Sequence, residues 1–224
     1  FLPLVLLGYA LVYERERMRD VWLLVASYAF YMAWNPLYAG LTAFSTIVDY
    51  FLGLRLAREE RSGVRKGLVT VSLLVNLGLL SVFKYFNFFL DLGDGLFAPL
   101  GVDLSGWHHD LLLPVGISFY TFQTLSYTLD LYGGKIGPER SLTKFALFVS
   151  FFPQLVAGPI VRARDFLPQM HTKVDLRAQQ FDDGLRRVFR GLFKKIVIAD
   201  LLANLGVDAV FADPTAYSSV DLLF

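Results

Sequence analysis

Residues 21–54 read VWLLVASYAFYMAWNPLYAGLTAFSTIVDYFLGL, and this apolar run decides the fold class. A helix needs about 20 apolar residues to cross a bilayer, so the run is long enough for two crossings. The pair Asn35-Pro36 predicts the turn between them, because proline disfavours helix in the residue before it. The whole chain of 224 residues is 55% hydrophobic and 18% charged, which is too apolar for one soluble core. We therefore predict an all-α, polytopic integral membrane protein.

Further apolar segments and basic loops alternate around this run. The other apolar segments predicted to cross cover residues 1–13, 68–90 and 111–132. The loops that carry Lys and Arg are 14–20, 55–67 and 133–144. Loop 91–110 contains neither Lys nor Arg. Since basic loops stay in the cytoplasm, we predict that the three basic loops lie inside and loop 91–110 outside.

The segment 145–161 is apolar, but Pro153 and the pair Gly158-Pro159 interrupt it. Basic residues flank it at both ends, which conflicts with a simple crossing. A re-entrant or broken helix that returns to the cytoplasmic side resolves the conflict. Non-helical backbone occurs within the membrane only where other parts of the protein bury it or where it lines a water-filled cavity. A kinked helix that crosses the membrane is the alternative.

Residues 181–203 begin with two opposed faces. The apolar face comprises Phe181, Leu185, Phe189, Leu192 and Phe193, and the basic face Arg186, Arg187, Arg190 and Lys194. Apolar residues at helical spacing opposite basic ones predict an amphipathic helix that lies at the cytoplasmic interface. We expect residues 1–224 to form a single membrane domain, the N-terminal part of a longer protein, because the sequence starts and stops in apolar segments.

Composition excludes several classes of function. The chain has no cysteine, which excludes disulfides, thiolate metal sites and cysteine nucleophiles. A net charge of +1, with basic residues confined to short loops, argues against nucleic-acid binding. The three histidines, His108, His109 and His171, match no metal-binding pattern, and we interpret them as structural or solvated. No metal site is predicted.

Polar side chains inside apolar segments are the candidates for chemistry. Asp49 lies deep in a span, where a charge costs about 2.5–3.5 kcal/mol. The segment 113–132 is unusually rich in hydroxyl groups. Small hydroxylated residues serve close helix packing in lipid, and the alternative is a polar cavity wall in which Gln123 is best able to bind a ligand. The spacing leaves both interpretations open.

Three stretches resemble motifs of the membrane-bound O-acyltransferase family: LPVGISFYTFQTLSYTLDLY (113–132), FFPQLVAGPIVRARDFLPQM (151–170) and FKKIVIAD (193–200). The resemblance runs over essentially the whole chain. It is strongest to the bacterial branch that O-acetylates alginate, with teichoic acid D-alanylation proteins more distant. It implies a helical ring around a thin central region, with funnels from both membrane faces.

The resemblance also implies which residues form the site. The candidate cavity wall comprises Ser118, Gln123, Ser126, Tyr127, Asp130, Pro153, Gly158, Pro159 and Asp200. The candidate donor-attracting residues are Arg162, Arg164, Lys194 and Lys195, whose alternative role is membrane topology alone. The family's catalytic histidine belongs to a later segment rich in Trp and Arg, and no histidine here matches it. We therefore assign no catalytic residue within residues 1–224 and expect this piece alone to be inactive.

The activity that the resemblance implies is O-acyl transfer. An acyl group, acetyl in this branch, would pass from a cytoplasmic donor such as acetyl-CoA towards hydroxyls of an exported polysaccharide. We expect no bound cofactor, a bacterial inner-membrane location, and three partners: membrane lipid, the polysaccharide acceptor and a periplasmic acetyltransferase. The alternatives are a transporter or flippase, which also uses broken helices, D-alanyl transfer to teichoic acid, and an inactive structural partner.

Overall fold

The computed structural model of the protein describes residues 1–97, 116–155, 158–173 and 178–212. Every regular element in these ranges is a helix, which confirms the predicted all-α class for the described residues. The chain divides into two compact units, Phe1–Lys173 and Val174–Phe224. The prediction of one membrane domain over the whole chain stays a prediction.

Two described helices are long and apolar enough to cross a membrane: α3 (Pro36–Arg58) and α4 (Ser62–Phe97). Their apolar windows have mean hydropathies of 1.3 and 1.8. The predicted turn before α3 is confirmed, because the Asn35 side chain accepts a hydrogen bond from the Leu37 N–H at 2.9 Å. Pro36 then takes the first helical position, where an N–H has no partner in the helix. The other predicted crossings stay predictions.

The helix α4 runs further than the sequence indicated. It continues through residues 91–97, which composition assigned to the outer loop 91–110. Once a long apolar segment has started a helix, each added residue forms a backbone hydrogen bond, whereas a glycine costs only about 1 kcal/mol. Glycine and aspartate in this stretch therefore do not end the helix. Residues 98–110 of that loop lie outside the described residues.

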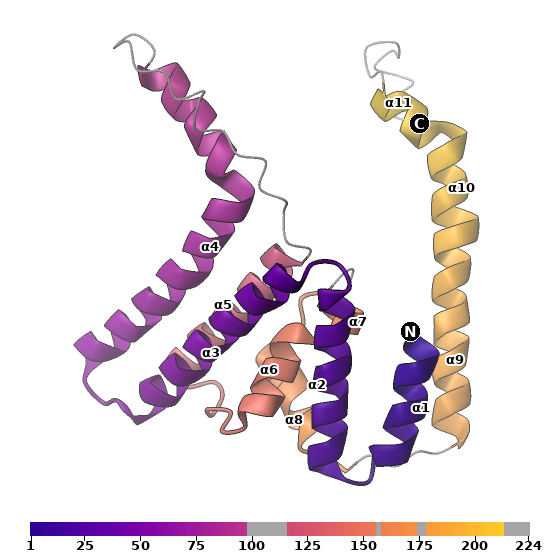
Figure 1. The fold of residues 1–224 in the computed structure, drawn as a ribbon, viewed down its shortest axis with the longest axis horizontal. Coiled ribbons are helices and arrows are strands. Elements are labelled where there is room, and N and C mark those ends of the chain that lie inside the picture. Colours follow the sequence, from indigo (N-terminus) through magenta and orange to yellow (C-terminus); the bar gives the residue numbers. More distant parts are fainter. Residues whose placement is uncertain (98–115, 156–157, 174–177, 213–224) are drawn as a thin grey trace. The chain divides into compact units, whose positions relative to one another are not determined.

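The first two helices, α1 (Leu2–Val12) and α2 (Glu16–Met32), pack against each other in the first unit (Figure 1). The indole N–H of Trp22 on α2 donates to the Val5 carbonyl of α1 at 3.0 Å. Val5 also belongs to a small apolar cluster with residues of α2 and of α7 (Phe152–Leu155). The short helix α7 is thereby held on α2.

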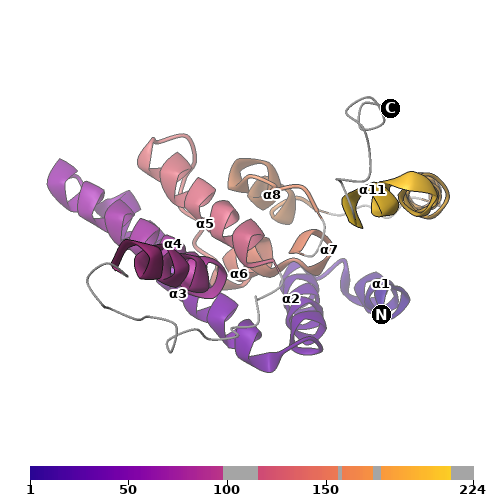
Figure 2. The same cartoon turned by 90° about the horizontal axis from the view of Figure 1, so that it is seen from above.

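The helix α5 (Ile117–Tyr132) packs against α3, α4, α6 (Leu142–Ser150) and α8 (Ala163–Met170). Figure 2 shows α5 beside α6 and α8 when the first unit is seen from above. The largest completely buried side chains of this core are aromatic: Tyr120, Tyr127, Phe145 and Phe148. Burying such side chains contributes most of the packing energy of a core, and it places the polar residues of α5 inside the unit.

The second unit is helical throughout its described part. Its elements are α9 (Ala178–Phe193), the π-helical stretch η3 (Lys194–Ala199), α10 (Asp200–Leu202), the π-helical stretch η4 (Ala203–Val207) and α11 (Asp208–Ala212). The apolar side chains of α9 predicted to form one face, among them Phe181 and Phe189, are exposed. The amphipathic helix is thus present, and its place at the membrane interface stays a prediction.

Candidate functional site

The interruption predicted within residues 145–161 is a break in the helix. The helix α6 ends at Ser150, α7 adds one turn, and residues 158–162 are non-helical before α8 begins. Pro153 cannot continue α6, because it lacks an N–H and its ring would clash with the carbonyl four residues earlier. Pro153 and Pro159 are both exposed. The break is therefore present, whereas its return to the cytoplasmic side stays a prediction.

Side chains replace the hydrogen bonds that the broken helix loses. The Phe148 carbonyl, near the end of α6, accepts from Nε2 of Gln154 at 3.1 Å and from Nε2 of Gln123 at 3.5 Å. The Phe152 N–H donates to the Ser27 hydroxyl of α2 at 3.3 Å. These groups are buried, so the protein itself satisfies the backbone at the break. Gln123, predicted as a ligand-binding residue, has a structural contact here.

Two glycines allow close backbone contacts at the broken segment, one with α5 and one within the segment itself. Gly116 precedes α5 with φ +77°, and an added Cβ would lie 2.6 Å from the Leu155 carbonyl oxygen of α7. At Gly158 an added Cβ would lie 2.5 Å from the Gln154 Cα atom. A side chain would be strained at the first position and would collide with backbone at both. The first two sequence motifs therefore meet at Gly116 and α7.

Three predicted cavity-wall residues of α5, Ser118, Gln123 and Ser126, differ in their surroundings. Ser118 is half-buried near the start of the helix. The Ser126 hydroxyl donates to the Gln123 carbonyl of its own helix at 2.7 Å. Gln123 is 2% exposed, and its Oε1 atom has no hydrogen-bond partner among the described residues. Since buried polar atoms are rarely unpaired, this oxygen is available to a ligand or to water.

Tyr127 and Asp130 connect the end of α5 to the loop that follows it. The Tyr127 hydroxyl accepts a hydrogen bond from the Glu139 N–H at 3.1 Å. Oδ1 of Asp130 lies 3.5 Å from Nζ of Lys135, while its Oδ2 is buried without a partner in the described part of the chain. The two residues thus hold the loop that carries Lys135 and Glu139.

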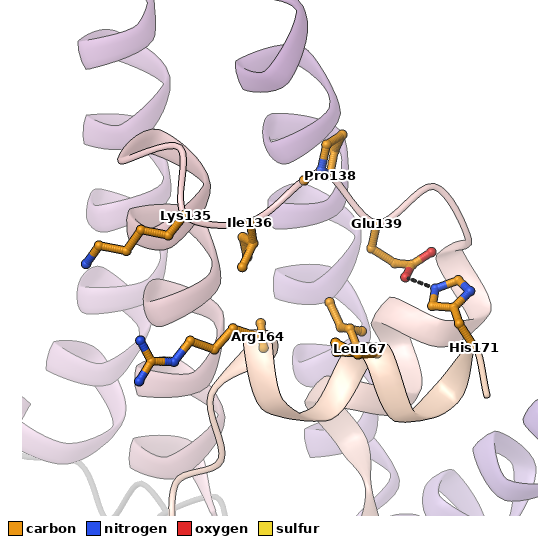
Figure 3. A pocket seen from close by; sticks show the side chains of 10 residues that line it. Lys135, Ile136, Pro138, Glu139, Arg164, Leu167 and His171 are labelled. Atoms are coloured by element: carbon orange, nitrogen blue, oxygen red, sulfur yellow. Dashed lines mark hydrogen bonds and ion pairs between the residues drawn. The ribbon is translucent and has the colours of Figure 1, made fainter.

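This loop and α8 enclose a pocket of about 440 Å³. Its lining residues are Lys135, Ile136, Gly137, Pro138, Glu139, Ala163, Arg164, Leu167, Pro168 and His171. Figure 3 shows Lys135 and Arg164 extending towards the same side, with Glu139 and His171 paired at the opposite side. Arg164 is the donor-attracting candidate that lines it. The pocket is therefore apolar in the middle and bounded by an imidazole–carboxylate pair at one side. At the other side lie the basic groups of Lys135, 3.5 Å from Asp130, and of Arg164, 3.8 Å from Asp165.

The imidazole–carboxylate pair belongs to a larger charged cluster. Nε2 of His171 lies 2.8 Å from Oε2 of Glu139, and Nδ1 lies 2.8 Å from Nζ of the buried Lys144. Because an ammonium group has no lone pair, Nδ1 accepts and Nε2 donates to the carboxylate. Lys144 also donates to Glu16 of α2, and this contact lowers the pKa of the Glu16 carboxyl. These contacts agree with a structural role for His171.

A second polar network lies inside the first unit, between the two long helices and α5. The completely buried Asp49 accepts from the Ser72 hydroxyl at 2.6 Å and from Nδ2 of Asn76 at 2.7 Å. Thr124 of α5 donates to Oδ1 of Asn76 at 3.0 Å, and Thr128 lies 3.2 Å from Ser72. Asp49 stands out in the sequence as a carboxylate within a span, whereas Ser72 and Asn76 are ordinary polar residues of an apolar helix and do not.

The remaining candidates are not among the residues that line the pocket. Arg162 is exposed just before α8. In the second unit, Lys195 and Asp200 form an exposed ion pair with each other, and Lys194 is exposed beside them. Among the residues that the structure describes, no three His, Asp or Glu side chains are grouped so as to hold a metal ion.

Known proteins are similar in sequence to most of this chain. Residues 136–223 match the family model of the membrane-bound O-acyltransferases. A probable alginate O-acetylase of Azotobacter vinelandii is 40% identical over 96% of this chain and 43% of its own length. A peptidoglycan O-acetyltransferase of Helicobacter pylori is 32% identical over 98% of this chain and 46% of its own length. A teichoic acid D-alanyltransferase of Bacillus subtilis is 29% identical over 40% of this chain and 23% of its own length.

The chain spans less than half the length of each of these relatives. No solved structure matches it. The family match includes α8 and the pocket loop from Ile136 onwards, and the similarity to the alginate protein extends over nearly all residues of the chain. The helical fold and these matches together show that the chain belongs to the membrane-bound O-acyltransferase family.

Proposed function

We propose that the full-length protein transfers an acetyl group from a cytoplasmic thioester, acetyl-CoA, towards hydroxyls of an exported polysaccharide. It works in the bacterial inner membrane with a periplasmic acetyltransferase that completes the transfer. The observation that carries this proposal is the 40% identity to a probable alginate O-acetylase over 96% of the chain. The similarity to a peptidoglycan O-acetyltransferase supports acetyl as the group transferred, because both relatives are O-acetylating proteins by name.

The reaction sets requirements for the complete site. The acceptor oxygen attacks the thioester carbonyl, a C–O bond forms, the C–S bond breaks, and the hydroxyl proton passes by way of a base to the departing thiolate. A general base and donors to the developing oxyanion lower the barrier. We assign the base to the histidine expected after residue 224. Gln123 and the neighbouring polar residues of α5 are proposed to line the path of the acyl group.

The pocket between loop 133–141 and α8 suits the approach of a phosphorylated donor. Its volume of about 440 Å³ lies in the range of small-molecule sites. Lys135 and Arg164 extend towards one side of it, and a guanidinium group binds phosphate oxygens in bidentate fashion. The loop is predicted to be cytoplasmic, where acetyl-CoA is found. We therefore propose that Arg164 attracts the donor, with Arg162, which directly precedes α8, adding positive charge. Lys194 and Lys195 are proposed as donor-attracting residues of the second unit, considered by itself.

The experiment replaces the chromosomal gene with full-length variants and measures ester groups on the secreted polymer by mass spectrometry after mild alkaline release. Deletion of the gene should abolish released acetate, and the wild-type gene should restore it. Release of D-alanine instead would support the teichoic acid alternative. Polymer that keeps its acetyl content in the deletion strain would overturn the proposal.

A kinetic comparison tests the donor pocket. Arg164→Gln should raise the KM for acetyl-CoA several-fold in membrane vesicles and leave kcat almost unchanged, because it removes attraction and not chemistry. Arg61→Gln is the matched control, since Arg61 is an exposed arginine of another basic loop. Equal KM values in both variants would remove Arg164 from the donor site.

A further inference from the structure

The C-terminal end of α3 carries a hollow with two chemical halves. It has a volume of about 490 Å³, and Phe51, Leu54, Arg55, Arg58 and Glu59 line it. Phe51, Leu54, Arg55 and Arg58 follow one another at helical spacing, so they share one face of α3. Phe51 is 59% exposed although it lies in a helix long and apolar enough to cross a membrane. The apolar half of the hollow is therefore followed directly by two cations.

The two arginines at this end have no partner in the part of the chain that the structure describes. Neither the Arg55 nor the Arg58 guanidinium group forms a hydrogen bond or ion pair with any residue that the structure describes, and both are exposed. Glu59 also lines the hollow. Its carboxylate accepts a hydrogen bond from the Arg61 backbone N–H at 3.1 Å and lies 3.7 Å from the Arg61 guanidinium group. The hollow thus holds two cations and one carboxylate, and its net charge is positive.

The helix end does not need these arginines for its own hydrogen bonds. Arg65 donates to the Leu56 and Glu59 carbonyls at 3.1 and 3.2 Å, and to the Tyr132 carbonyl at 2.8 Å. Carbonyls at the end of a helix attract cations, and Arg65 meets that requirement. Among the described residues, Arg55 and Arg58 therefore neither cap the helix nor form an ion pair.

We propose that this hollow binds an anionic phospholipid, with the phosphate on Arg55 and Arg58 and an acyl chain against Phe51 and Leu54. Along α3 the apolar lining residues come first and the arginines second. A lipid at a membrane surface has the matching order, with its acyl chains towards the membrane interior and its phosphate at the surface. The loop that follows α3 is predicted to be cytoplasmic, so the lipid belongs to the inner leaflet. Basic residues beside a spanning helix attract anionic lipid, and two arginines one turn apart share one phosphate.

Native mass spectrometry of the full-length protein in neutral detergent tests this binding. Phosphatidylglycerol should bind more tightly than phosphatidylcholine with the same chains. The double variant Arg55→Gln/Arg58→Gln should weaken phosphatidylglycerol binding roughly 30-fold, from the typical contribution of each basic residue near an anionic surface. Inorganic phosphate should not compete at millimolar concentration, because the acyl chain is part of the ligand.

The matched control is Arg61→Gln/Lys66→Gln, which removes the same charge from the same basic loop at exposed positions outside the hollow. It should weaken binding less than threefold. An equal loss in both double variants would show that general charge, and not the hollow, attracts lipid. Unchanged binding in Arg55→Gln/Arg58→Gln, or competition by inorganic phosphate, would likewise overturn the proposal. Thermal unfolding of each variant confirms that it is folded.

Discussion

Replacing Gly116 by alanine tests the contact between α5 and the broken segment. The residue has φ +77°, and an added Cβ would lie 2.6 Å from the Leu155 carbonyl oxygen. The left-handed conformation costs a residue with a side chain about 1–2 kcal/mol, and overpacking a tight contact costs about 1–3 kcal/mol more. Because the obstructing atom belongs to the backbone, it cannot rotate away. We therefore expect Gly116→Ala to lower the free energy of unfolding by about 2–5 kcal/mol.

Gly134 provides the control, because a side chain there would meet the conformational cost without the steric one. Its φ is +68°, but an added Cβ would meet no atom within 4 Å. Gly134→Ala should therefore cost only the conformational part, about 1–2 kcal/mol. Intrinsic tryptophan fluorescence of the purified full-length protein in detergent gives the unfolding midpoint of each variant. Equal decreases in midpoint would refute the steric argument at Gly116, and no decrease in either would refute the conformational argument as well.

Two further predictions concern polar contacts of the first unit. Asn76→Leu should lower the free energy of unfolding by about 1–3 kcal/mol, because Asp49 and Thr124 lose a buried partner. The double variant Asn76→Leu/Asp49→Leu should lower it by less than the sum of the two single variants. Additive changes in the unfolding midpoint would contradict this coupling. Lys144 lowers the pKa of Glu16 below its ordinary value of 4.5, so this contact stabilises the fold above that pH and the contribution is lost as the pH falls through the lowered pKa. The difference in unfolding midpoint between wild type and Glu16→Gln should therefore be present at pH 7 and shrink below about pH 4.5, whereas a constant difference would contradict the assignment.

Local rules predicted the features that depend on a few neighbouring residues. The turn at Asn35-Pro36 follows from the restriction that proline imposes on its own backbone and on the preceding residue. The break after Ser150 follows from Pro153 in the same way. The end of α4 was predicted wrongly, because loop composition near Asp91 opposes a helix less strongly than the apolar segment favours one.

The candidate site was less accessible to sequence analysis. Arg164 was singled out for its charge, and it does line a pocket. Glu139 and His171, which close the opposite side, lie 32 residues apart and show no shared pattern. Lys144 and Glu16 are 128 residues apart, so no spacing rule connects them. Such contacts exist only because α2, α6 and α8 pack together.

The membrane class, the two long apolar helices, the start of α3 and the break after Ser150 all follow from the sequence, whereas the starts of α2 and α4, at Glu16 and Ser62, lie inside stretches predicted as loops. These features follow from local hydrophobicity and from the backbone limits of proline, which act over a few residues. Tertiary structure alone decided which polar groups meet. Asp49 obtains its two donors, and Gln123 keeps one oxygen without a partner among the described residues, because close packing leaves buried polar atoms only those partners that neighbouring helices bring within reach.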